Sequence, residues 1–272
     1  MAFPKVPRAR YEISPLTEVV CQLKFPPILR IEAELPAAFQ EKVRTDFPLF
    51  ETVEADPNSH LPPELARFIP PGGISSSPIE HLFSSDEENR TWTLGLGRSK
   101  LGLSTSAYRQ WEEFRQKLAG PHAALIKEYQ PAPFNHVCLR YRNIIRRSLL
   151  PSLEPDVPWS ELLQPPLCGF LAAPELQGEV VMTRMTAGTR LPGGIGWLDV
   201  QYGLVQEEPD GETAFRIDVH LFNLGPTEPT NAFDRLDALH HQAGSFFRWC
   251  ITDRLHDALG PRPVAMAILG RS

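Results

Sequence analysis

Charged and histidine side chains recur at every second position in several segments that have strand periodicity. Arg140 and Arg142 are two residues apart, as are Asp218 and His220, so each pair falls on one side of a strand. Arginine binds carboxylate or phosphate groups through two parallel hydrogen bonds. We expect a shared sheet face to carry Gln22, Lys24, Arg140, Arg142, Asp199, Gln201, Arg216, Asp218 and His220. Such a set predicts either a binding surface or a network of internal ion pairs.

Acid–base and metal chemistry have a narrower basis in the sequence. Asp199, Asp218 and His220 are residue types that act as acids, bases or metal ligands. A metal site needs three or four converging ligands, and here the third would depend on an unknown strand register. We therefore predict no catalytic residue, no metal site and no cofactor. Trp197 and Phe222 fall in the same phase, where aromatic side chains stack on nucleobases or contact a protein partner.

The remaining motifs are better explained as structure. Residues 95–102 (GLGRSKLG) and 191–197 (LPGGIGW) lack the GxxxxGK[ST] pattern of a phosphate-binding loop, and they adjoin strands. The pair His240-His241 lacks the HExxH spacing of a zinc protease, and no serine lies in a GxSxG motif. The four cysteines are far apart in the chain, which predicts small buried thiols and no disulfide framework.

The first half of the chain begins with a predicted strand at residues 18–25, which Pro26-Pro27 ends. Residues 36–46 predict a short helix, residues 49–54 and 79–84 predict strands, and residues 92–103 predict a hairpin. An amphipathic helix follows from about 107 to 129, and Gly120-Pro121 is expected to kink or break it.

The same order of elements starts again at Val137. A strand is followed by a short helix at 159–163 and by strands near 179–189, 197–206 and 214–222. A closing helix is predicted over 232–259, and Gly260-Pro261 stops it. Prolines gather at 57–78 and 151–174, which predicts two long ordered loops.

These elements predict an α+β fold with two related β-α-β(3-4)-α halves, residues 1–130 and 131–272. An antiparallel sheet would carry long helices packed on one face. In element order this plan is similar to the pseudo-symmetric saddle of the TATA-binding-protein type, and a helix-grip fold for each half is the alternative.

Composition narrows the function classes. The chain has 272 residues, of which 42% are hydrophobic, so it is long enough to bury a core. The net charge of −6 disfavours non-specific binding to nucleic acid or to an anionic membrane. No segment approaches the roughly 20 apolar residues that a membrane helix needs, and the first residues do not resemble a secretory signal. We therefore expect a cytoplasmic protein.

Several phrases resemble a sporadically distributed, uncharacterised bacterial protein family of similar length. The segments that carry this resemblance are EVVCQLKFPPILRI, PAAFQEKVRTDFPLFE, LGLSTSAYRQWEEF and YQPAPFNHVCLRYRNII. The family brings no established activity, cofactor or catalytic residue. The resemblance implies a bacterial protein with an accessory role, such as defence or toxin neutralisation.

We expect a non-enzymatic binding protein that holds a macromolecular partner. The acidic net charge favours a protein partner or self-association over nucleic acid. One alternative is an enzyme or ligand-sensing pocket built on the polar sheet face, and another is a nucleic-acid binder that uses the same arginines.

Overall fold

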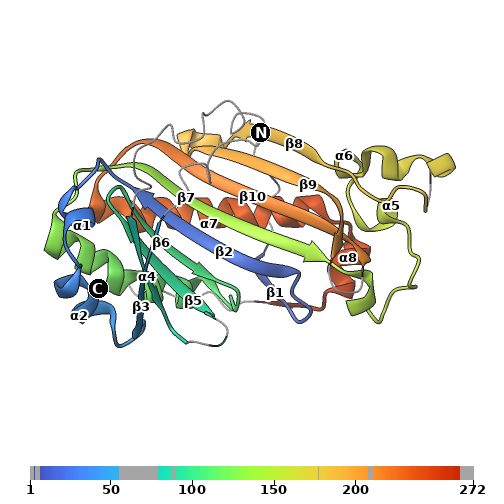
Figure 1. The fold of residues 1–272 in the computed structure, drawn as a ribbon. Helices are drawn as coiled ribbons and strands as arrows, with labels where there is room; N and C mark the ends of the chain where they lie inside the picture. Colours follow the sequence, from blue (N-terminus) through green and yellow to red (C-terminus); the bar gives the residue numbers. More distant parts are fainter. Residues whose placement is uncertain are drawn as a thin grey trace, which may run out of the picture. The chain divides into compact units, whose positions relative to one another are not determined.

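The computed structural model describes residues 3, 7–54, 79–86, 88, 90–176, 178–207 and 211–263. The fold combines helices with an antiparallel sheet, as predicted (Figure 1). In the described residues, nine strands follow the order β3-β4-β5-β6-β2-β7-β10-β9-β8, and β1 pairs with β11 in a separate small sheet. The first proline-rich segment, residues 57–78, lies outside the described residues.

Contacts divide the chain into two compact units, and neither unit is a continuous segment. Unit 1 comprises Met1–Val19, Cys138–Asn223 and Asp234–Ser272, and unit 2 comprises Val20–Val137 and Leu224–Phe233. The division into halves at residues 130 and 131 stays a prediction.

Unit 2 contains the elements predicted for the first half. Its strands are β2 (Leu16–Lys24, which begins in unit 1), β3 (Leu49–Glu54), β4 (Ile79–Ser84), β5 (Trp92–Gly97) and β6 (Lys100–Thr105), and its short helices are α1 (Arg30–Ala33) and α2 (Ala37–Val43). Strands β3 to β6 form an antiparallel meander. The exposure of side chains alternates along β2, β3 and β6, which is the period-two pattern that located these strands in the sequence.

Helix α4 (Trp111–Tyr129) contradicts the expected break at Gly120-Pro121, because the helix continues through Pro121. A proline inside a helix costs about 3 kcal/mol, because it removes a hydrogen bond and crowds the preceding turn. Burial of the helix offsets this cost: Phe114, Leu118 and Leu125 are fully buried. The ring of Phe114 lies 5.7 Å from that of Trp92 on β5.

Unit 1 is built on the long strands β7 (Phe134–Ile145, which begins in unit 2), β9 (Trp197–Glu207) and β10 (Glu212–Thr227). Strand β8 (Met185–Arg190) pairs with β9 and is shorter than the predicted 179–189. The short strands β1 (Ala9–Tyr11) and β11 (Pro261–Pro263) pair with each other. Ile217, Val219 and Leu221 form one buried row of β10 and are at most 2% exposed.

The predicted closing helix is two helices, α7 (Ala232–Cys250) and α8 (Asp253–Ala258). Ile251 makes a β-bridge to Leu163 between them, and Thr252 caps α8 with its side chain. The second proline-rich segment packs at this break. It contains α5 (Trp159–Leu162), α6 (Pro165–Cys168) and the short 3-10 turns η2 (Gly169–Ala172) and η3 (Pro174–Leu176).

Single-turn 3-10 helices complete the described elements. They are η1 (Arg147–Leu149), η4 (Pro192–Gly194) and η5 (Pro229–Asn231). Among the described helices, none has the length and apolar character needed to cross a membrane.

Candidate functional site

One face of the unit 1 strands carries the predicted polar residues. The Tyr141 hydroxyl is 2.9 Å from His240 Nδ1 on α7, so Tyr141 faces that helix. Arg140 and Arg142 flank Tyr141 on β7 and therefore lie on the other side of the sheet. On the paired strands, the register sets Asp218 opposite Gln201 and His220 opposite Asp199. We call this side the polar face; its residues are Arg140, Arg142, Trp197, Asp199, Gln201, Arg216, Asp218, His220 and Phe222.

The arginines of β7 are engaged in ion pairs. Arg140 donates from Nε to Asp218 Oδ1 at 2.7 Å and from its terminal nitrogen to Oδ2. Arg142 Nε lies 3.6 Å from Asp218 Oδ2, and its Nη1 is 3.2 Å from Glu18. The hydrogen bonds that Arg140 donates to Asp218 are the main reason why the pKa of Arg140 is raised, although burial opposes the rise. The network neutralises most of the positive charge that the sequence places here.

The other predicted residues of the polar face have separate surroundings. Arg216 donates to Gln201 at 3.4 Å. Asp199 is exposed near the edge of the sheet, and Trp197 is 38% exposed with the Arg190 guanidinium 5.0 Å from its ring centre. Lys24 ends β2 in unit 2 and does not belong to the unit 1 group.

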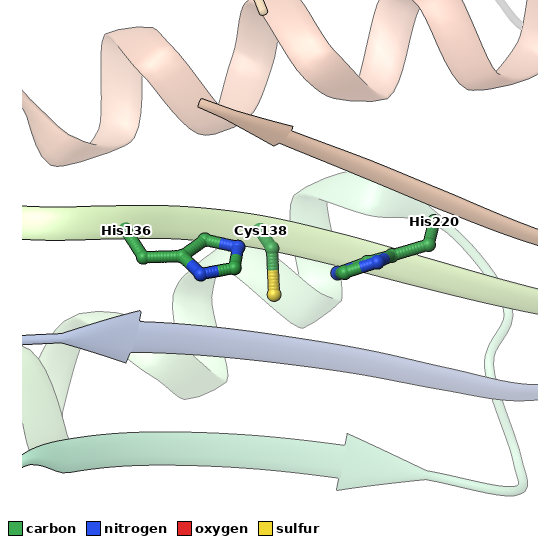
Figure 2. Close-up of side chains that lie close together, drawn as sticks. All are labelled: His136, Cys138 and His220. Carbon is green, nitrogen blue, oxygen red and sulfur yellow. The ribbon is translucent and has the colours of Figure 1, made fainter. Parts of the chain in front are cut away.

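A second cluster on the polar side consists of metal-ligating side chains. His136 and Cys138 are two residues apart on the continuous strand β7, so both point to one side, and His220 comes from β10, the next strand in the sheet. Their ligand atoms, two imidazole nitrogens and one sulfur, all lie within 4.8 Å of one another. Figure 2 shows the Cys138 sulfur between the two imidazole rings. Cys138 is 3% exposed, and both histidines are half-buried.

The periodicity of the sequence singles out His220 but neither of its neighbours. The wide spacing of the cysteines predicts only a small buried thiol at Cys138, and no motif includes His136. The spacing His-x-Cys on a predicted strand is the signal that could have found them, because it sets two ligand types on one side. The third member depends on the alignment of strands that are about 80 residues apart in the chain, which local periodicity does not contain.

A comparison with protein-family models finds no match for this chain, and a search of curated proteins finds no relative.

Proposed function

We propose that this chain is a binding protein that holds a protein partner on the polar face of unit 1. The observation that carries the proposal is the state of that face: all of its residues except the buried Asp218 are at least partly exposed, its strongest charges are paired with one another, and an aromatic side chain lies open at one end. Such a mixture of satisfied charges and exposed aromatic surface is typical of protein contact surfaces.

Charge pairing favours a protein over a nucleic acid. A nucleic-acid surface needs arginines and lysines that are available to neutralise phosphates. Arg140 and Arg142 instead contact Asp218 and Glu18, and the whole chain has a net charge of −6. Binding a phosphate would require these arginines to give up carboxylates that they already hold.

The enzyme alternative has less support. A cavity of about 240 Å³ lies in unit 2, lined by Leu49, Phe50, Glu51, Leu82, Ser84 and Arg90. No residue of the polar face lines it, and its open lining, which is polar and apolar in equal parts, contains one ion pair, between Arg90 and Glu51. Among the residues that line this cavity, no general acid and general base lie together in a pocket that excludes water.

We also propose that the chain is a duplicated β-α-β-α unit. Two stretches of the strand order support this: β3-β4-β5-β6-β2 and β7-β10-β9-β8. In each stretch the first strand of the stretch in chain order, β2 or β7, lies beside the last, β6 or β10, and a long helix, α4 or α7, follows these strands along the chain. A saddle of the TATA-binding-protein type has this kind of internal symmetry.

Capture experiments with charge-reversed variants test the binding proposal. Asp199→Arg changes the exposed part of the polar face and leaves the Arg140–Asp218 pair intact. Asp156→Arg makes the same charge change at an exposed position away from the sheet and serves as the matched control. We expect the wild-type chain and the control to retain the same protein from a lysate of the source cells, and Asp199→Arg to lose it.

Nuclease treatment of the lysate separates the partner classes. Retention that survives nuclease supports a protein partner, whereas nuclease-sensitive retention favours the nucleic-acid reading. Self-association is measured by light scattering of the purified chain, and loss of a dimer in Asp199→Arg would make a second copy the partner. Equal retention by Asp199→Arg and the control contradicts the proposal.

A further inference from the structure

The cluster of His136, Cys138 and His220 has the composition of a transition-metal site. Imidazole nitrogen and thiolate sulfur are the ligands that zinc prefers, whereas calcium and magnesium prefer oxygen. We propose that these three residues bind one zinc-class divalent cation. The proposal is independent of the protein-binding function, because it depends on other side chains.

The separations fit a site that closes with small side-chain movements. Tetrahedral ligands at zinc bond lengths lie about 3.3–3.8 Å apart. The three ligand atoms here already lie within 4.8 Å of one another. Side-chain rotations that move an atom by about 1 Å reach metal-binding geometry, and the strand backbones do not need to move.

The backbone holds the ligands in place. His136 and Cys138 share one side of β7 because side chains alternate along a strand. His220 lies on β10, inside the hairpin that pairs Phe222 with Trp197 and Asp218 with Gln201. Its ring centre is 4.9 Å from that of Phe222, which limits how the imidazole can turn. Ligands on rigid strands lose little conformational freedom when they bind a cation.

Other described histidines serve the packing of the fold. His81 Nε2 lies 2.8 Å from the carbonyl of Ile31, and Nδ1 of His240 and of His256 lies 2.9 Å from a tyrosine hydroxyl. Each of these rings is thus oriented by a structural hydrogen bond. The rings of His136 and His220 lie on either side of a thiol, which is the arrangement of a ligand set (Figure 2).

Three protein ligands leave the fourth position of a tetrahedral cation open. Catalytic zinc sites have this arrangement, whereas structural zinc sites are filled by four protein ligands. The fourth position would take a water molecule or a donor atom from a bound molecule. Asp218 does not supply it, because both of its oxygens bond to Arg140.

Cobalt(II) titration of the full chain tests the site directly. The purified protein is treated with a chelator, exchanged into chelator-free buffer and titrated with Co²⁺. We expect one equivalent to bind and to give both the visible absorption of tetrahedral cobalt and a thiolate-to-cobalt charge-transfer band. Competition between Zn²⁺ and a chromophoric chelator then measures the zinc affinity.

Ligand substitutions and matched controls define the outcome. Cys138→Ser should abolish the charge-transfer band, and His136→Ala or His220→Gln should weaken zinc binding at least about a hundredfold, since loss of an outer-shell partner alone costs 10–100-fold. Cys21→Ala and His241→Ala, which change the same residue types elsewhere, should bind as the wild type does. Far-UV circular dichroism identifies any variant that fails to fold. If His220→Gln fails to fold, His220→Asn replaces it. Absence of a charge-transfer band in the wild-type protein, or a band that persists in Cys138→Ser, overturns the proposal.

Discussion

Arg140 and Asp218 lie on neighbouring strands of the polar face and are joined by two hydrogen bonds, with Arg140 Nε 2.7 Å from Asp218 Oδ1. The side chain of Asp218 is only 9% exposed, whereas that of Arg140 is 40% exposed. The carboxylate therefore depends on the arginine more than the arginine depends on the carboxylate, because the buried charge has less access to water.

Arg140→Ala should lower the free energy of unfolding by about 1–2 kcal/mol, because it leaves the Asp218 carboxylate with a weaker partner at 3.6 Å. We expect the lower part of the range for charged hydrogen bonds, since water screens the half-exposed guanidinium. Urea unfolding measures the change. Arg142→Ala is the matched control and should cost less, because its contacts with Asp218 and Glu18 are longer. An equal or larger loss for Arg142→Ala would contradict this order.

Thr252 links α8 to the proline-rich segment through one hydroxyl. Its Oγ1 accepts a hydrogen bond from the Leu255 amide at 3.4 Å and donates to the Glu161 carbonyl at 2.7 Å. Thr252→Ala should therefore lower the unfolding free energy by about 1–2 kcal/mol, which combines a lost helix cap with a lost hydrogen bond. Thr252→Ser keeps the hydroxyl and should retain most of the stability. Equal losses for both substitutions would assign the effect to the missing methyl group.

Two glycines should respond to alanine in opposite directions. Gly120 lies inside α4, and a Cβ atom added there has no neighbour within 4 Å. Gly120→Ala should raise the unfolding free energy by about 0.5–1 kcal/mol, since alanine restricts the unfolded chain and favours the helix. Gly203 on β9 has φ +151°, and an added Cβ would lie 2.1 Å from the Thr183 carbonyl oxygen. Gly203→Ala should lower the unfolding free energy by at least about 2 kcal/mol. Urea unfolding measures both changes.

His122 should make the protein less stable below neutral pH. It is 6% exposed, and its ring centre lies 5.0 Å from that of Phe233 and 5.9 Å from that of Phe134. Burial lowers its pKa from the usual 6.5, although a hydrogen bond to the Pro229 backbone opposes the shift. Between pH 6.5 and the lower folded pKa, the unfolded chain binds more protons than the folded chain. Stability is therefore complete above pH 6.5 and falls as the pH drops through this window.

The loss from His122 cannot exceed about 1.4 kcal/mol per pH unit, the limit for one proton. His256, whose pKa is also lowered mainly by burial, adds a change of the same sign. Urea unfolding at a series of pH values from 7.5 to 5 measures the slope. His122→Leu removes the titrating group and should flatten the curve, whereas His241→Ala should leave the slope of the wild type. A wild-type slope in His122→Leu would show that other groups cause the loss.

Local periodicity was sufficient for most of the elements. Residues 49–54 and 79–84 were predicted as strands with the bounds of β3 and β4, because alternation with period two is contained within each segment. Gly120-Pro121 was predicted to kink or break the helix, and the break does not occur, since the burial of the helix outweighs a local preference. The separation of α7 from α8 was missed because it depends on a β-bridge between Ile251 and Leu163, which are distant in the chain.

For the candidate sites, too, local periodicity predicted some features, whereas others depend on contacts between distant segments. Alternation predicted which residues of β7 and β10 share a side, and Arg140, Arg142 and Asp218 do contact one another. An internal network of ion pairs was one of the two predicted alternatives, but alternation did not identify Asp218 as the partner of the arginines, nor did it place His220 beside Cys138. Both relationships require the register between two strands, which is decided by the packing of the whole sheet.

The pairing of β1 with β11 has a consequence for how the chain folds during synthesis. Ala9, Arg10 and Tyr11 bond to a strand that is made some 250 residues later, at Pro261–Pro263. A nascent chain therefore cannot complete this small sheet until the ribosome has released that segment, whereas the meander from β3 to β6 involves only neighbours and can form early. Strand β1 must therefore stay unpaired for most of translation, and we expect chaperones to bind it during that time.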